Sequence, residues 1–186
     1  METLYKKVNM KDLLAQGLYL LMKQKSFEKI TIKQICDKTG VIRGTFYNHF
    51  CDKFETLEYL TYQILLPNEK NIDFKEMLRI SLEQIENNKE FFYEAFKIEG
   101  QNSFVDMLEH IFETHIKAYC NELNLDFSKI PMKDTVFYEY FSLSFVYIIK
   151  NWVCKQKDVS ADKIFLQCEF IFKHSFFDIV SNKSCE

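Results

Sequence analysis

The feature that most restricts the fold of this 186-residue chain is its shortage of turn-forming residues, with four Gly and two Pro. Average usage would give about 13 Gly and about 9 Pro in a chain of this length. A fold of many short strands needs a turn after each strand, whereas long helices need few breaks. Hydrophobic residues make up 47% of the chain, which is enough for a packed core. The composition therefore predicts an all-α protein.

The sequence contains no pattern that predicts a membrane span, a signal peptide or a metal site. Residues 1–12 are polar and lack the apolar stretch of a signal peptide. The longest uncharged stretch, residues 140–149, has about half the length of a membrane span. The six Cys form no C-x-x-C pair, which argues against a zinc site or a thioredoxin-like motif. We therefore expect a cytoplasmic protein without a metal or cofactor.

Charge is distributed unevenly along the chain. The net charge is −3, but residues 1–50 carry nine Lys or Arg against four Asp or Glu, a balance of +5. The remaining 136 residues therefore carry −8. A basic end on an acidic protein is typical of a chain that contacts nucleic acid phosphates at one end.

The spacing of apolar residues predicts about nine helices separated by short polar breaks. We expect two domains, residues 1–52 (the head) and residues 53–186 (the body). The helix at 53–66 would connect them and end at Pro67. The expected helices cover residues 8–25, 31–40, 42–48, 53–66, 74–87, 89–98, 104–123, 132–155 and 161–180.

Two short helices around Gly40 have the pattern of a helix-turn-helix. Thr31 and Gln34 predict a capping box, in which the Thr31 hydroxyl accepts from the Gln34 amide and the Gln34 side chain reaches back. Gly40 is expected to end this helix, because Gly readily adopts the left-handed conformation found at helix C-termini. The next helix begins within a few residues, as in a helix-turn-helix whose second helix enters the major groove of DNA.

Residues 27–35, 40–50 and 52–53 together resemble the DNA-binding signature of the TetR/AcrR family. The resemblance implies a dimeric regulator without enzymatic activity, with a three-helix DNA-binding domain and a helical domain for ligand binding and dimerisation. One departure is Ile42, where the family usually has Ser, Thr or Ala, so a helix cap is lost. The expected DNA-binding residues are Thr31, Lys33, Arg43, Gly44, Thr45, Tyr47, Asn48, His49 and Lys53.

The residue types in this signature suit contacts to phosphates and bases. Lys29, Lys33, Lys38, Arg43 and Lys53 surround the turn and the third helix, and their charges are complementary to phosphate. Lys53 also stands at a helix N-terminus, where free amides favour an anion. Tyr47 and His49 have polar tips for phosphate, although each has an alternative role, in the core or in a solvated turn.

We expect Phe46 and Phe50 to pack the third helix onto the first and fourth. Gly44 carries no side chain, so the backbone at this position can approach the wall of the groove.

The helix expected at 132–155 has almost no charged face, since Glu139 and Lys150 are the charged residues between 135 and 153. A helix that is apolar all round must be buried all round, and a body of this size cannot easily cover it. We therefore expect a homodimer held by the last two helices. The expected interface residues are Tyr138, Phe145, Ile149, Trp152, Ile164, Phe165, Cys168 and Phe172.

The many aromatic residues of the body are either core filler or the wall of a cavity for a small apolar ligand. With a cavity, the protein would be a repressor that such a ligand releases from a palindromic operator. Without one, it would be a TetR-like co-regulator or an architectural DNA-binding protein. The expected wall residues are Phe92, Phe96, Phe104, Met107, Phe112, Phe141 and Phe145.

Residues 109–115 hold the densest group of acidic and histidine side chains. At 100° per residue, Glu109 and Glu113 share a helix face, whereas His110 and His115 lie about 100° and about 240° away from Glu109. This scatter suits neither a zinc protease site nor a di-iron bundle. We therefore expect no enzymatic activity.

Overall fold

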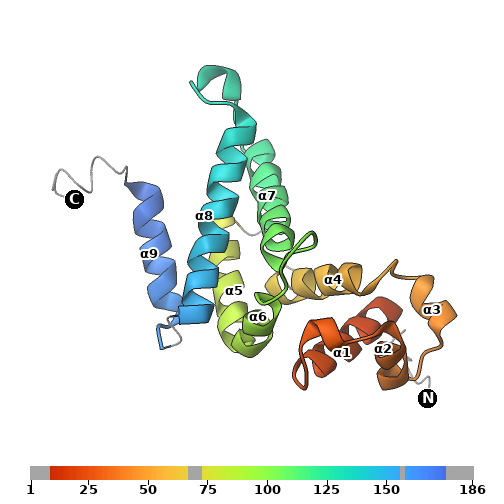
Figure 1. Ribbon diagram of the computed structural model, residues 1–186. Coiled ribbons are helices and arrows are strands. Elements are labelled where there is room, and N and C mark those ends of the chain that lie inside the picture. Colours follow the sequence, from red (N-terminus) through yellow and green to blue (C-terminus); the bar gives the residue numbers. More distant parts are fainter. Residues whose placement is uncertain (1–8, 67–72, 156–157, 175–186) are drawn as a thin grey trace, which may run out of the picture.

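In the computed structural model, which describes residues 9–66, 73–155 and 158–174, every regular element is a helix (Figure 1). The all-α prediction is confirmed, with short 3₁₀ helices in two stretches expected as breaks. Pro67 and residues 175–180, the expected ends of two helices, lie outside the described residues. The helices are α1 Met10–Met22, η1 Phe27–Lys29, α2 Ile32–Thr39, α3 Arg43–Tyr47, α4 Lys53–Leu65, α5 Phe74–Asn87, α6 Lys89–Ala95, α7 Phe104–Glu122, η2 Phe127–Lys129, α8 Asp134–Lys155 and α9 Ala161–Lys173.

Local capping explains why the short helices of the head begin and end where they do. Both halves of the expected capping box form: the Gln34 amide donates to Thr31 Oγ1 over 3.3 Å, and the Thr31 amide donates to Gln34 Oε1 over 3.0 Å. Gly40 ends α2 in the left-handed conformation, with φ 71° and ψ 21°. At the start of α4, Asp52 Oδ1 accepts from the amides of Phe54 and Glu55 over 2.8 and 2.9 Å.

The head is held by a small apolar core and by one close approach between helices. Helix α1 packs against both α2 and α4. At Gly17 on α1, an added Cβ would lie 2.4 Å from Thr39 Cγ2 on α2, so the two helices touch without room for a side chain. Phe46 and Phe50 are buried in this core, as expected, and connect α3 to the other helices. The orientation of α3 is therefore set by the burial of Phe46 and Phe50 in this core.

The head contacts the body through α6 and through α4. Tyr19 on α1 donates its hydroxyl to Asn88 Oδ1 over 2.8 Å, and its ring lies 5.7 Å from that of Phe91 on α6. Helix α4 contacts α1 on one side and α5 on the other. In Figure 1, α4 extends from the head to the lower end of the bundle formed by α5 to α8. A movement of α6 would thus act directly on α1, and a movement of α5 would act directly on α4.

The body is a helical bundle in which α7 runs along α8 and α5 runs along α9 (Figure 1). Trp152 on α8 is fully buried, and its indole N–H donates to the Val159 carbonyl over 2.7 Å. This bond ties Val159, shortly before α9, to α8. Glu86 on α5 also accepts from the amide of Ala161, the first residue of α9, over 3.2 Å.

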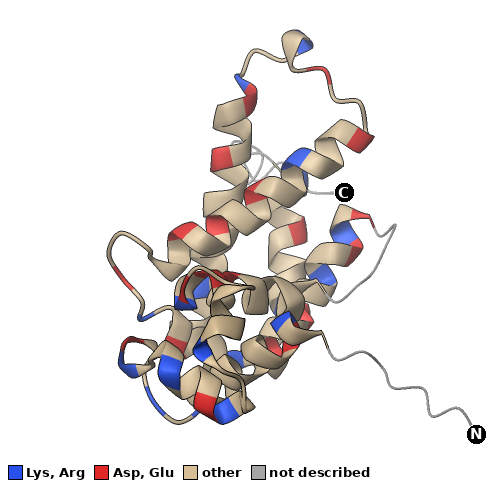
Figure 2. Cartoon of the chain, turned by 90° about the vertical axis from the view of Figure 1, so that its right-hand side faces the viewer, with Lys and Arg blue, Asp and Glu red and all other residues tan. Residues whose placement is uncertain are grey.

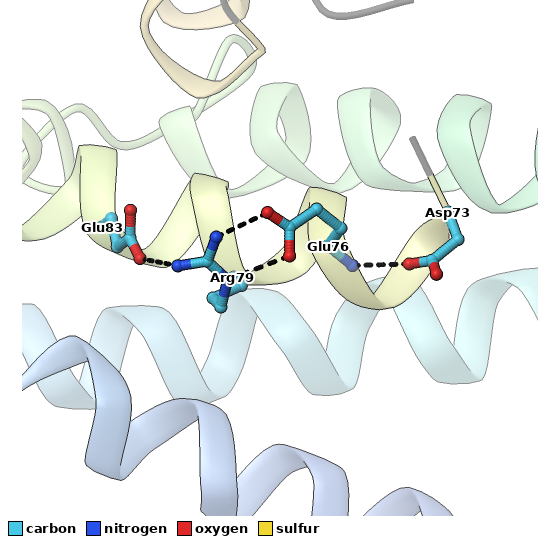
Figure 3. Close-up of polar contacts among 4 residues, drawn as sticks. All are labelled: Asp73, Glu76, Arg79 and Glu83. Carbon is cyan, nitrogen blue, oxygen red and sulfur yellow. Dashed lines mark hydrogen bonds and ion pairs between the residues drawn. The ribbon is translucent and has the colours of Figure 1, made fainter. Parts of the chain in front are cut away.

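The solvent-facing side of α5 carries a row of linked charges (Figure 3). Asp73 Oδ1 accepts from the Glu76 amide over 2.7 Å and caps the helix. The Arg79 guanidinium binds both carboxylate oxygens of Glu76, at 2.9 and 2.5 Å, and it also binds Glu83. The bond to Arg79 lowers the pKa of Glu76. These pairs at helical spacing support α5 on the face that the bundle leaves in water.

Within the described residues, the helices are too short or too polar to cross a membrane.

Candidate nucleic-acid interface

The exposed end of the helix-turn-helix brings together most of the residues expected to bind DNA. Arg43, Gly44, Tyr47 and Asn48 on or next to α3 are exposed, and Tyr47 keeps 53% of its surface. Tyr47 therefore does not serve as a core residue, which was the alternative interpretation. An added Cβ at Gly44 would meet nothing within 4 Å, so the surface at this turn of α3 is open.

The start of α2 is also exposed. Thr31 and Lys33 are both exposed. The Thr31 oxygen accepts the Gln34 amide, so its hydroxyl proton remains available to donate to a phosphate oxygen. Thr45 on α3 is half-buried, and so is His49, two residues after the end of α3. The structure thus places eight of the nine expected residues on or beside an accessible surface.

Lys53 is the exception, because its ammonium is turned toward its own chain. Its ammonium donates to the carbonyls of Phe27, Glu28 and Ile30 over 2.9, 3.2 and 3.0 Å, and it lies 4.4 Å from the centre of the Phe27 ring. An ammonium has three N–H donors, so these carbonyls use all of them. Burial lowers the pKa of Lys53, against the raising effect of Glu28. In this structure Lys53 ties η1 to α4 instead of facing a phosphate.

The amides at the start of α4 are also occupied. Asp52 accepts from two of them and places a carboxylate where a phosphate was expected. The Cys51 amide donates to Glu55 over 2.5 Å. An acidic side chain at a helix N-terminus already satisfies the dipole, which removes the reason to expect an anion there. The sequence contained this signal, because Asp52 is itself a strong capping residue.

Basic residues remain prominent around the helix-turn-helix. Lys29, Lys33, Lys38 and Arg43 are all exposed. Figure 2 shows several Lys and Arg positions at the head end of the molecule, with Asp and Glu among them and also spread along the helices of the body. The head therefore exposes cations that are close in sequence to α3 and could bind phosphates.

Several residues expected to line a ligand cavity instead fill the core. Phe92, Phe104 and Phe112 are buried, as are Phe96 and Phe145. The rings of Phe96 and Phe104 lie 5.2 Å apart edge to face, and those of Phe112 and Phe145 are stacked at 5.8 Å. Aromatic rings at these distances pack against one another. These five residues therefore lie in the core and pack against one another.

An apolar pocket of about 390 Å³ lies elsewhere in the body, between α5, α7, α8 and α9. Of the expected wall residues, this pocket includes Phe141. Its charged residues are Lys75, Glu169 and Lys173, and the two ammonium groups each lie 2.8 Å from the Glu169 carboxylate. The pocket is lined by Phe74, Lys75, Leu78, Ile116, Tyr119, Cys120, Leu123, Leu125, Phe137, Phe141, Phe165, Glu169, Phe172 and Lys173.

Most of the residues expected at a dimer interface are buried within the single chain. Of the eight, six have at most 7% of their surface exposed: Tyr138, Phe145, Ile149, Trp152, Ile164 and Cys168. Phe165 and Phe172 are half-buried and line the pocket. The reason is that α8 covers its bulkiest side against α6 and α7, so these side chains are already in contact with their own chain.

A different apolar stripe on α8 and α9 faces solvent. The spacing of one helix face on α8 brings together Val136, Tyr140, Leu143 and Tyr147. Their exposed fractions are 49, 62, 47 and 70%. On α9 the exposed apolar residues are Leu166, Phe170 and Ile171. The spacing of the α8 stripe was visible in the sequence. It was obscured there because the opposite face of α8 is apolar as well.

The acidic and histidine residues of α7 have ordinary structural roles. His115 Nδ1 lies 2.7 Å from the Ile111 carbonyl, and Glu113 pairs with Lys117 at 2.6 Å. Burial and neighbouring acidic groups raise the pKa of Glu109. Among the described residues, no group of three or more His, Cys, Asp or Glu side chains is arranged to hold a metal ion.

Comparison with known proteins finds a family model that matches the body and solved structures with a similar fold. A family model described as "Transcriptional regulator C-terminal region" matches residues 73–174. No curated protein matches the chain. A solved structure named "Dihydroxyacetone kinase operon activator DhaS" has a TM-score of 0.63 at 17% identity, over 88% of this chain and 93% of the other. A putative TetR-family transcriptional regulator from Syntrophomonas wolfei has a TM-score of 0.57 at 18% identity, over 94% of this chain and 96% of the other.

Proposed function

This chain belongs to the TetR family of transcriptional regulators, and from that premise we propose that it is a repressor that binds a palindromic operator as a homodimer. We further propose that a small, largely apolar ligand releases it from DNA. The observation that carries the DNA-binding proposal is the exposed N-terminal end of α3, in a head that also exposes Lys29, Lys33 and Lys38.

In the proposed DNA interface, one set of residues contacts the bases and another contacts the phosphates. Arg43, Gly44, Thr45 and Asn48 face the major groove, because the N-terminal residues of a recognition helix reach base edges. Contacts to the phosphate backbone come from the polar tips around them, namely Thr31, Lys33, Tyr47 and His49. Lys53 supports this surface from behind by holding η1 against α4.

The dimer is proposed to form through the exposed apolar stripe of α8 and the outer face of α9. Tyr140 and Tyr147 are large, and 62 and 70% of their surfaces are exposed in the single chain. Two copies of this stripe would cover one another across a twofold axis, as obligate dimers cover apolar faces of similar kind. A palindromic operator has the same symmetry, with half-sites one helical turn or a multiple of it apart.

The pocket between α5, α7, α8 and α9 supports the ligand part of the proposal. Its volume of about 390 Å³ and its mainly apolar lining suit a small hydrophobic molecule. Because α9 forms one wall and is also proposed to lie at the dimer interface, a ligand here would act on the spacing of the two heads. A ligand releases DNA only if it binds better to the spacing that DNA does not accept.

The alternative is a co-regulator or architectural protein without a small-molecule ligand. The direction of regulation is not a property of the fold, since one of the structural neighbours is named an operon activator. Ligand binding distinguishes the two functions. A series of alkyl alcohols and carboxylates of increasing length is screened for a rise in melting temperature and a fall in DNA affinity. Leu123→Trp, which narrows the pocket, should abolish both effects. Protein that binds no member of the series supports the alternative.

DNA binding is tested on duplexes selected from a random library. Arg43→Ala should weaken binding and relax base preference, whereas Tyr47→Ala should weaken binding to all sequences. Lys129→Ala is the matched control, because Lys129 is an exposed cation on the body. Selection of no preferred sequence, or full affinity in the Arg43→Ala, Tyr47→Ala double variant, would refute the proposed interface.

A further inference from the structure

Ile42 is an apolar side chain at the start of the proposed recognition helix, and 75% of its surface is exposed. Its neighbour Val41, also β-branched, is half-buried and packs against the core. The turn between α2 and α3 therefore directs one aliphatic side chain inward and the next one outward. This outward side chain contributes nothing to the core of the head.

Ile42 does not stabilise α3 through its side chain either. It occupies the N-cap position in extended conformation, with φ −78° and ψ 152°, and makes no side-chain cap bond. Its carbonyl accepts from the amides of Thr45 and Phe46 over 3.0 and 3.3 Å, so its backbone is held in place by α3 itself. The side chain is thus presented from a fixed position.

The surroundings of Ile42 are open and polar. Arg43 and Gly44 follow it directly and are both exposed, and an added Cβ at Gly44 would meet nothing within 4 Å. An aliphatic group presented here gains nothing from water or from phosphate. In the major groove, the apolar group on the edge of a base pair is the C5-methyl of thymine, and aliphatic side chains recognise it by contact.

We propose that Ile42 determines base specificity by contacting a thymine methyl in each half-site of the operator. The inference rests on the proposed function, because it requires α3 to enter the major groove. It adds a residue that was not among the expected DNA contacts, together with the chemical group that this residue recognises. The operator should therefore contain an A·T pair, with thymine in a fixed strand, at one symmetric position near the start of α3.

The test removes the methyl group from DNA one position at a time. Duplexes selected by the wild-type protein are resynthesised with deoxyuridine in place of each thymidine, and binding is measured by fluorescence anisotropy. Loss of about one buried methyl should weaken binding about fourfold in one half-site and about 15-fold in both. Ile42→Ser should bind the thymidine and deoxyuridine duplexes equally. Leu20→Ser, which removes an exposed aliphatic side chain on α1, should retain the full preference.

The outcomes separate this inference from the function on which it rests. If the wild-type protein selects no sequence, the proposed function fails. If it selects a sequence but tolerates deoxyuridine at every position, the role of Ile42 is overturned while the proposed function stands. This measurement uses the wild-type protein alone, so it does not depend on the folding of a variant. A methyl preference that persists in folded Ile42→Ser, checked by circular dichroism, also overturns it.

Discussion

Replacing Gly17 by Ala tests how closely α1 and α2 must approach to position the recognition helix. On an open helix surface this change would stabilise the protein by up to about 1 kcal/mol. Here the new Cβ would lie 2.4 Å from Thr39 Cγ2, which is far inside van der Waals contact. Thr39 cannot move freely, because its hydroxyl donates to the Ile35 carbonyl over 2.9 Å.

Overpacking of this kind typically costs about 1–3 kcal/mol, and disturbing the Thr39 hydrogen bond adds about 1 kcal/mol. Against the helix-propensity gain, we expect Gly17→Ala to lower the unfolding free energy by about 1–3 kcal/mol. Urea denaturation followed by circular dichroism measures this change. DNA affinity should also fall, since α2 and α3 would shift relative to α1 and α4.

Thr39→Ser provides the decisive partner, because it removes Cγ2 and keeps the hydroxyl. The double variant Gly17→Ala, Thr39→Ser should recover most of the lost stability. Gly44→Ala is the matched control: its Cβ meets nothing within 4 Å, so it should not destabilise the fold although it should weaken DNA binding. A coupling energy between positions 17 and 39 below about 0.5 kcal/mol would refute the reasoning.

Three further changes test other parts of the structure. Lys53→Met should lower the unfolding free energy by about 1–3 kcal/mol in urea denaturation, because three carbonyls lose their donor. Unchanged stability together with weaker DNA binding would instead indicate that Lys53 contacts DNA. Leu143→Glu should give monomers in sedimentation at micromolar concentration, since a carboxylate would be buried at the proposed seam, and a stable dimeric variant would contradict that seam. The bonds to Lys173 and Lys75 lower the pKa of Glu169 to about 2 from 4.5, so its contribution to stability is complete above pH 4.5 and is lost as pH falls through about 2. Thermal melts should therefore show wild-type protein losing its advantage over Glu169→Gln as the pH falls from 5 to 3, and a constant difference would exclude this role.

The short-range features of this chain were predictable from its sequence. Thr31, Gln34 and Gly40 specify the bounds of α2 through local hydrogen bonds and one backbone conformation, so neighbouring residues suffice to predict them. The exposed positions of α3 followed from the same reasoning. Lys53 was assigned differently because its partners are carbonyls more than 20 residues earlier, whose position depends on how η1 packs on α4.

The two faces of α8 could not be separated from the sequence, because both are apolar. Phe145 and Trp152 were expected at a partner subunit, yet they are buried against their own chain, and the exposed stripe lies on the other side. The pocket lies away from most of the residues expected to line it, for a similar reason. Its walls come from four helices, and its place depends on the approach of α9 to α5, which no periodicity along the chain encodes.

The inward-facing ammonium of Lys53 has a consequence for the ionic conditions in which this protein would work. Each cation that contacts DNA displaces condensed counterions, and the logarithm of the binding constant falls with the logarithm of salt concentration by about 0.9 for each such contact. If the four exposed cations Lys29, Lys33, Lys38 and Arg43 all bind phosphate in both subunits, the slope has a limit of about −7. Two more contacts from Lys53 would steepen that limit to about −9. Because this charge is turned toward its own carbonyls, the proposed DNA complex would be less sensitive to a rise in salt concentration, and a larger share of its affinity would come from the bases themselves.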